Sequence, residues 1–126
     1  MIERREFSRL RINKDCVVFI NKSFKEIDAN IRDISENGVC LEVDKSQSAF
    51  IEVGETVNFC TLDSYKDLAN NVVEEIVIEK AIINRISEED NILVLGCSIE
   101  SPKGTYVKYV EDRKISSFIN NIIRKE

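Results

Sequence analysis

The chain has 126 residues, of which 43% are hydrophobic and 33% are charged, and its formal net charge at neutral pH is −5. This length predicts one domain with a core of its own. The absence of histidine removes the commonest general base. With no glycine-rich phosphate loop and no metal-ligand spacing either, the sequence predicts no catalytic residue and no metal site.

No apolar run approaches the ~20 residues that a membrane helix needs, and the first residues are too polar for a signal peptide. We therefore expect a cytoplasmic protein without membrane insertion. The four cysteines are far apart in the sequence and lie in or beside apolar runs, which predicts buried, reduced thiols. They are Cys16, Cys40, Cys60 and Cys97.

The first segment is a basic arm, residues 1–14. Five cations against two glutamates give it +3, which leaves −8 for the rest of the chain. Arginine binds phosphate through forked contacts and stacks on bases, so an arginine-rich arm beside an acidic body suggests a small anionic ligand. Duplex nucleic acid would need a basic face on the folded domain itself. The alternative is a solvated, charged terminus.

After the arm, six segments rich in β-branched and aromatic residues predict strands, because turn residues separate them and several alternate between apolar and polar. The fifth is interrupted near Glu79 and Lys80. Short strands joined by hairpins favour a mainly β fold, a small antiparallel barrel or sandwich. The predicted strands cover residues 15–21, 26–33, 39–43, 55–62, 72–86 and 92–99.

The last segment changes to a helical period. Beyond Pro102, hydrophobic residues recur on one face of a helix that closes on Arg124 and Lys125. We expect this amphipathic helix to pack on its own barrel, the alternative being another subunit. The hydrophobic face contains Ile115, Phe118, Ile119, Ile122 and Ile123.

A polar turn separates the second and third predicted strands. Asp33 and Ser35 are residues that bond their own backbone in turns, and Asn37-Gly38 is a strong hairpin signal. These residues can therefore be explained as an ordinary turn that connects two strands. A second explanation arises when the turn is considered together with the arginine-rich arm.

Arg5-x-x-x-Arg9 precedes Asp33-x-Ser35-x-x-Gly38 by 24 residues. This pair of motifs resembles the PilZ family, small β-barrel receptors for the bacterial second messenger cyclic di-GMP. The resemblance extends over the whole chain. It implies a flexible ligand-clamping arm over residues 1–14, a six-stranded PilZ-type barrel over 15–100 and a C-terminal helix over 101–126, in one PilZ domain.

The resemblance also implies which residues bind the ligand. Arg5 and Arg9 would be the main clamps, and the turn residues Asp33, Ser35 and Gly38 would line the barrel side. Cyclic di-GMP offers two phosphates and two guanines, and arginine forks match both the phosphate oxygens and the O6/N7 edge of guanine. A carboxylate such as Asp33 accepts from the guanine N1 and N2 donors.

Four further residues are considered, Arg4 as another ligand-binding residue and the other three as accessories. Arg4 is similar to the extra arginine of members that bind two intercalated ligand molecules, and it suggests a ligand dimer. Arg11 and Asn37 are candidate accessories, for which surface charge and turn residue are the favoured explanations. Gly96 is balanced between a strand glycine at a bulge and proximity to the ligand.

The functional expectation is therefore a non-enzymatic receptor or adaptor that needs no cofactor. Ligand binding would order the arm, and the ordered arm would signal to an unidentified protein effector in motility, adhesion or polysaccharide output. The alternative is a PilZ-like protein interaction module that does not bind nucleotide.

Overall fold

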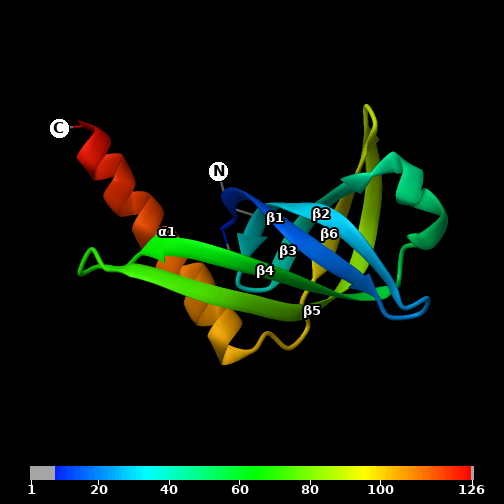
Figure 1. Cartoon of the computed structure of the whole chain (residues 1–126), viewed down its shortest axis with the longest axis horizontal. Helices are drawn as coiled ribbons and strands as arrows, with labels where there is room; N and C mark the ends of the chain where they lie inside the picture. Colours follow the sequence, from blue (N-terminus) through cyan, green and yellow to red (C-terminus); the bar gives the residue numbers. More distant parts are fainter. Residues whose placement is uncertain (1–7, 126) are drawn as a thin grey trace, which may run out of the picture.

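The computed structural model describes residues 8–125. Hydrogen-bonded neighbours follow the order β1-β2-β3-β6-β5-β4, and β4 pairs back to β1, which closes an antiparallel barrel (Figure 1). The mainly β fold with six antiparallel strands is thus confirmed, as a barrel and not a sandwich. The elements are β1 Leu10–Ile20, β2 Lys25–Ser35, β3 Gly38–Asp44, the 3-10 helix η1 Lys45–Phe50, β4 Thr56–Lys66, β5 Val72–Glu89, β6 Ile92–Ser98 and α1 Gly104–Lys125.

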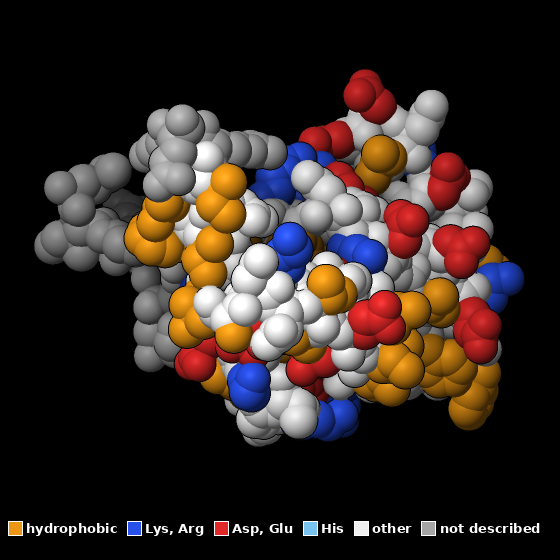
Figure 2. Space-filling model, turned by 60° about the vertical axis from the view of Figure 1, so that its left-hand side comes forward, with side chains coloured by type: hydrophobic (Ala, Val, Ile, Leu, Met, Phe, Trp, Pro, Cys, Tyr) orange, Lys and Arg blue, Asp and Glu red, His pale blue; other side chains and the backbone are white. Residues whose placement is uncertain are grey.

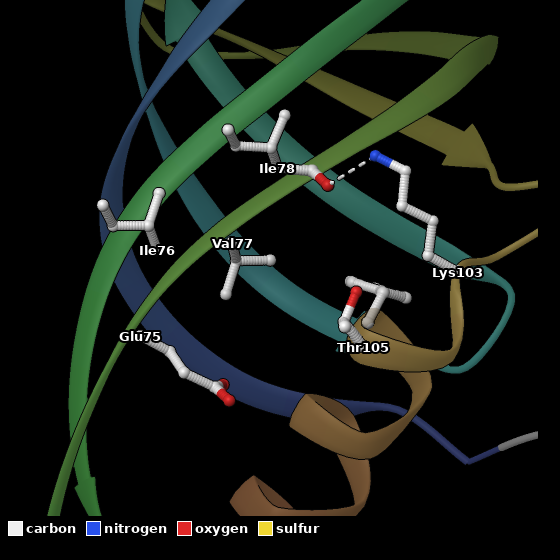
Figure 3. A pocket seen from close by; sticks show the side chains of 7 residues that line it. Glu75, Ile76, Val77, Ile78, Lys103 and Thr105 are labelled. Atoms are coloured by element: carbon white, nitrogen blue, oxygen red, sulfur yellow. Dashed lines mark hydrogen bonds between the residues drawn. The ribbon is translucent and has the colours of Figure 1, made fainter.

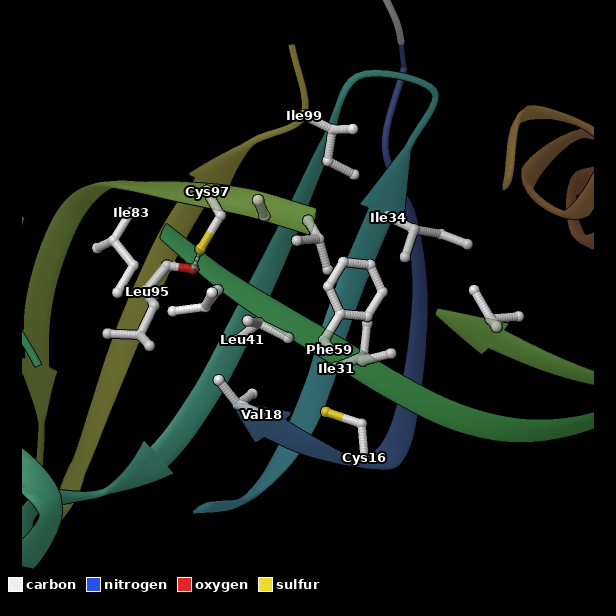
Figure 4. Packing of buried hydrophobic residues seen from close by; sticks show 14 of the residues in the cluster. Cys16, Val18, Ile31, Ile34, Leu41, Phe59, Ile83, Leu95, Cys97 and Ile99 are labelled. Carbon is white, nitrogen blue, oxygen red and sulfur yellow. Dashed lines mark hydrogen bonds between the residues drawn. The ribbon is translucent and has the colours of Figure 1, made fainter. Parts of the chain in front are cut away.

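The barrel interior is filled by the inward-facing residues of all six strands (Figure 4). Strands place alternate residues on opposite faces, so β4 buries Val57, Phe59 and Thr61 while Cys60 and Leu62 face outward. Fully burying one Val, Ile, Leu or Phe side chain contributes about 1.5–3 kcal/mol. This alternation holds the barrel closed and fixes which residues reach its outer face.

Strand β1 begins at Leu10, five residues before the predicted start. Leu10 and Ile12 pack against the core, the register with β2 shifts between Arg11 and Lys14, and Asn13 adopts a φ of 48°. The inward and outward alternation continues through this bulge, but Lys14 is a polar residue at a half-buried position and makes the strand pattern hard to recognise in the sequence. Residues 10–14, expected within the arm, are therefore part of the barrel wall.

Strand β5 is continuous at Glu79 and Lys80, so the predicted interruption there is wrong. Both residues pair regularly with β4. Glu79 faces inward and is 2% exposed, because its carboxylate accepts from the backbone N–H groups of Lys80 and Lys103 at 2.9 and 3.0 Å. The irregularity of β5 lies further on, between Ile83 and Arg85.

Helix α1 covers one end of the barrel with its first half and projects past the strands with its second half (Figure 1). Tyr106, Tyr109 and Val110 are buried, whereas Phe118 and Ile123 on the predicted apolar face are 65% and 61% exposed. The expectation that this face packs on its own barrel is therefore wrong for the projecting half. The reason is the orientation of the helix: at about 100° per residue, Phe118 and Ile122 point away from the side of α1 on which Tyr109 and Ser116 are buried.

A buried ionic cluster attaches α1 to the barrel. Asp63 is 3% exposed and accepts a hydrogen bond from the Tyr109 hydroxyl and another from the Ser64 backbone N–H at 2.8 Å. Arg113 Nε and Lys14 Nζ lie 3.3 and 3.9 Å from its carboxylate oxygens. A buried carboxylate is tolerated only with such partners, so Asp63 fixes the first half of α1 against β4.

All four cysteines are free. Three are buried as predicted, but Cys60 is exposed because it lies on the outer face of β4. Among the helices of residues 8–125, none is both long and apolar enough to cross a membrane.

Candidate ligand-binding site on the outer barrel face

The turn between β2 and β3 is centred on Glu36 and Asn37, and Ser35 and Gly38 form the pair that closes it. The Asn-Gly pair is therefore not the centre of the turn, and neither residue has a positive φ. The space around Gly38 favours glycine instead. A Cβ atom there would lie 3.1 Å from the carbonyl oxygen of Cys97, so a side chain at this position would require that carbonyl to shift by a few tenths of an ångström.

The turn is held from the barrel side by hydrogen bonds. Ser35 is 2% exposed, and its hydroxyl donates to the Asn37 side chain at 3.1 Å. Tyr106 of α1 donates to the carbonyl oxygens of Ser35 and Gly38 at 2.9 and 3.0 Å. Burial raises the pKa of Tyr106, so the hydroxyl keeps the proton that it donates. The turn is thus rigid before any ligand arrives.

Arg9 lies over this turn, immediately before β1. Its Nη1 is 2.7 Å from Oδ1 of Asp33, and the two side chains are 28% and 21% exposed. Its Nη2 lies 3.7 Å from the position that a Cβ of Gly38 would occupy. Arg9, Asp33 and Gly38, which the sequence spreads over 30 positions, therefore meet. Arg4 and Arg5 lie outside the described residues.

A row of small side chains crosses the sheet beside this contact. In the strand register Asp33 of β2 is opposite Cys40 of β3, which is opposite Gly96 of β6, which is opposite Arg85 of β5. The neighbours of these residues along each strand, such as Val39, Leu41, Leu95 and Cys97, belong to the core. The row therefore lies on the outer side of the sheet and forms a floor with arginine at both ends, within which Cys40 and Gly96 are themselves buried.

Gly96 has a specific role in this row. The Arg85 guanidinium Nη2 lies 3.1 Å from the position of a Gly96 Cβ, so the glycine leaves room for the arginine. Gly96 pairs regularly with β3, and the register shift belongs to β5. Gly96 therefore lies at a bulge that belongs to the paired strand β5, and close packing against Arg85 is a further reason for a glycine here. Its proximity to the ligand stays a prediction.

The floor has an excess of positive charge. Arg11 is exposed and is opposite Asp33 in the register. Within residues 8–125, no carboxylate lies within ion-pair distance of Arg11 or Arg85, and Asp33 is the only ion-pair partner of Arg9. Asn37 is exposed at the edge of the turn. Three guanidinium groups around one carboxylate favour an anionic ligand that also offers hydrogen-bond donors.

Three residues of this region were not anticipated. The position of Arg85 could be predicted from the sequence, because a two-residue turn at Asp90 and Asn91 pairs it with Gly96 on the next strand. No sequence pattern predicts the positions of Tyr106 and Lys114, since α1 reaches the β2–β3 turn only in the folded chain. Lys114 Nζ lies 3.0 Å from a Glu36 carboxylate oxygen and 3.3 Å from the Ser8 hydroxyl, so it joins helix, turn and arm.

Elsewhere, a hollow of about 300 Å³ lies between β5 and the start of α1 (Figure 3). The Lys103 ammonium donates to the Ile78 carbonyl at 3.4 Å beside it, and Glu75 hydrogen-bonds to the Tyr65 hydroxyl at 3.1 Å. Its charged groups are thus already engaged. No cluster of three or more metal-ligating side chains occurs in the part of the chain that the structure describes.

Comparison with known proteins identifies one matching family and several similar solved structures, of which two are described here. The family model described as PilZ domain matches residues 3–112. The inhibitor of motility MotI/DgrA of Bacillus subtilis superposes with a TM-score of 0.68 at 16% identity, over 90% of this chain and 53% of that one. The PilZ domain of YcgR from Escherichia coli, solved with c-di-GMP, gives a TM-score of 0.65 at 12% identity, over 98% and 96%.

These identities establish a common fold and no more. The chain spans about half the length of MotI/DgrA. No curated protein matches the chain.

Proposed function

The chain belongs to the PilZ domain family, and we propose that it is a non-enzymatic receptor for cyclic di-GMP in the bacterial cytoplasm. Binding orders the arginine-rich N-terminal segment over the β2–β3 turn and so signals to a protein effector. The YcgR PilZ domain, which shares this fold, was solved with c-di-GMP. The four free thiols fit a reducing compartment.

The observation that carries the proposal is the contact of Arg9 with Asp33 above Gly38. The ion pair uses one nitrogen of the guanidinium, and Nη2 lies over the glycine. A guanidinium has five donors in a fixed fork, so most of them remain for a phosphate or for the O6/N7 edge of guanine. Asp33 orients Arg9 in advance, which reduces the entropy lost when the ligand binds.

Beside this contact the Arg85 guanidinium lies over Gly96. From there it can stack on a base or pair with a phosphate of the ligand. We assign the primary contacts to Arg5, Arg9, Asp33, Ser35 and Gly38. Ser35 acts through the backbone of the turn, because its hydroxyl is already bonded to Asn37.

Calorimetric titration with cyclic di-GMP tests the proposal, with GTP and the linear dinucleotide as controls. We expect saturable binding of the cyclic dinucleotide alone. The double variant Arg5→Glu/Arg9→Glu should abolish it. The matched control is Lys22→Glu/Lys25→Glu, which makes the same charge change at the opposite end of β1, at its turn with β2. If the arginine variant still binds cyclic di-GMP, the assignment of Arg5 and Arg9 as ligand-binding residues is wrong.

The stoichiometry tests the role of Arg4. A ratio of two ligands per chain, reduced to one by Arg4→Ala, would support an intercalated ligand dimer. A ratio of one in the unmutated protein would remove that role. A flat titration with folded protein would instead favour the alternative, a PilZ interaction module that does not bind nucleotide.

Lys114 suggests how binding could be transmitted. It contacts Glu36 in the turn and Ser8 in the segment that carries the arginines. If the arm moves toward a ligand, the contact between Lys114 and Ser8 must change. Lys114 lies on α1, whose second half is exposed, so the change is transmitted to an exposed helix. We propose α1 and the arm as the output surface of the receptor.

A further inference from the structure

The second half of α1 is an uncovered hydrophobic surface. The helix has 22 residues, about 33 Å at 1.5 Å per residue, and its buried residues extend only to Ser116. Beyond that point Phe118, Ile122 and Ile123 are 65%, 44% and 61% exposed. Figure 2 shows a band of hydrophobic side chains on this end of the molecule. We call residues 115–123 the helix stripe.

The composition of the helix stripe is unusual for an exposed segment. It contains five hydrophobic residues with serine and asparagine between them, and no charged residue, in a chain that is 33% charged. Ile115, Phe118 and Ile122 follow the 3–4 spacing of a helix–helix seam. A helix face meant for water would carry charges, so this composition indicates a face that another helix covers.

The charges at the two ends of the stripe have opposite signs. Glu111 and Asp112 precede it, and Arg124 and Lys125 follow it in the sequence. Phe118 is midway between these pairs. If two copies of the helix lie antiparallel about a two-fold axis at Phe118, the acidic pair of each copy lies beside the basic end of the other. A two-fold interface requires this self-complementarity.

We propose that the helix stripe is the interface of a homodimer in which two α1 helices pack antiparallel and meet at Phe118. The pattern of charges selects a second copy of this chain over an unrelated helix, because one sequence supplies both halves of the match. Asp112 is already bonded to Lys108 at 2.7 Å, so Glu111, which is exposed, is the main acidic partner.

The expected affinity is modest. A stripe of nine residues on one helix buries less than the ~800 Å² per partner of a standard interface. We therefore expect a dissociation constant on the order of 10⁻⁵ M. The dimer must accordingly be sought over a range of concentrations.

Sedimentation equilibrium of the ligand-free full chain, from about 1 µM to about 1 mM, is the test. The apparent mass should rise from 14.5 kDa toward twice that value. Phe118→Lys and, independently, Ile122→Lys should keep the protein monomeric, with circular dichroism unchanged. A mass of one chain throughout this range, or a concentration dependence that survives both substitutions, would overturn the proposal.

Two controls separate this interface from other hydrophobic surfaces. Val53 is 61% exposed and lies between η1 and β4, so Val53→Lys should leave the dimer intact. Leu62 on the outer face of β4 is 64% exposed. Loss of the dimer in Leu62→Lys but not in Phe118→Lys would assign association to the β4–β5 surface and refute the helix stripe.

A charge swap tests the antiparallel geometry. Glu111→Lys and Lys125→Glu should each weaken the dimer by about tenfold, since each places like charges together. The double variant Glu111→Lys/Lys125→Glu should restore it. Single variants that weaken association without rescue in the double variant would contradict the pairing of these ends.

Discussion

The hydroxyl of Tyr106 lies 2.9 Å from the carbonyl oxygen of Ser35, although 71 residues separate them in the sequence. The same hydroxyl is 3.0 Å from the carbonyl oxygen of Gly38. One side chain of α1 thereby holds both ends of the β2–β3 turn on which the candidate ligand site is built. The stability of the helix and the geometry of the site are therefore linked.

Tyr106→Phe should lower the free energy of unfolding by about 1–3 kcal/mol, because it removes the buried hydroxyl that bonds the carbonyl oxygens of Ser35 and Gly38. It should also weaken cyclic di-GMP binding, since the turn loses its support. Urea unfolding and calorimetry measure the two effects. Tyr65→Phe is the control, because Tyr65 bonds Glu75 away from the turn; an equal loss of ligand affinity there would contradict a specific role for Tyr106.

Gly38→Ala should destabilise the protein by about 1–3 kcal/mol, because the new Cβ would lie 3.1 Å from the Cys97 carbonyl oxygen and overpack the strand pair. It should also reduce ligand affinity, because the new methyl group occupies space beside Nη2 of Arg9, on the barrel side of the candidate site. Gly104→Ala is the matched control, since nothing lies within 4 Å of its Cβ position. Thermal unfolding of both variants should separate them, and similar melting temperatures would show that the contact at Gly38 relaxes without cost.

Arg85→Ala should reduce the affinity for cyclic di-GMP by about tenfold, equivalent to about 1.4 kcal/mol, with little change in stability because the side chain is exposed. Lys80→Ala removes an exposed cation from the same strand outside the candidate site and should leave the affinity unchanged. Equal affinities in the two variants would remove Arg85 from the site.

The network around Glu42 should make stability depend on acidic pH. Desolvation raises the pKa of Glu42, but hydrogen bonds from Arg32 and Asn30 outweigh it and hold the pKa below its ordinary value of 4.5. The folded state therefore binds this proton less tightly than the unfolded state. The resulting stabilisation is present above pH 4.5 and is lost as the pH falls through the lower, folded pKa.

Glu42→Gln should accordingly reduce stability by about 1–2 kcal/mol near neutral pH, and the difference from the unmutated protein should shrink in acid. Denaturant unfolding at about pH 7 and about pH 3 measures it. Glu52→Gln changes an exposed carboxylate and should show no such trend. A deficit in Glu42→Gln that stays constant with pH would exclude the ionised carboxylate as its cause.

One cysteine should react quickly with a thiol reagent. Cys60 is exposed, whereas burial raises the pKa of Cys16 and of Cys97 to about 12, and burial also raises that of Cys40. Ellman's reagent at about pH 8 should therefore modify one thiol in the native protein and all four after unfolding. Cys60→Ser should lack the fast phase; a fast phase that persists would show that a second thiol is accessible.

The strands and the family can be predicted from the sequence. Alternating apolar residues and polar turns predict strands, since a strand buries one face and exposes the other. The motif pair carried by Arg9, Asp33, Ser35 and Gly38 predicts the family, and the family model agrees over residues 3–112. Local patterns fail where a polar residue occupies an inner position, as at Lys14, or where a distant backbone N–H group bonds a buried carboxylate, as at Glu79.

Only the tertiary structure decides which residues meet. The contact of Arg9 with Asp33, the position of Arg85 over Gly96 and the bond from Tyr106 to Ser35 depend on strand register and on where α1 crosses the barrel. Periodicity shows that α1 has an apolar face, but it contains no information on which side of the helix meets the barrel. Burial depends on the shape of the whole molecule, and for that reason the helix stripe is exposed.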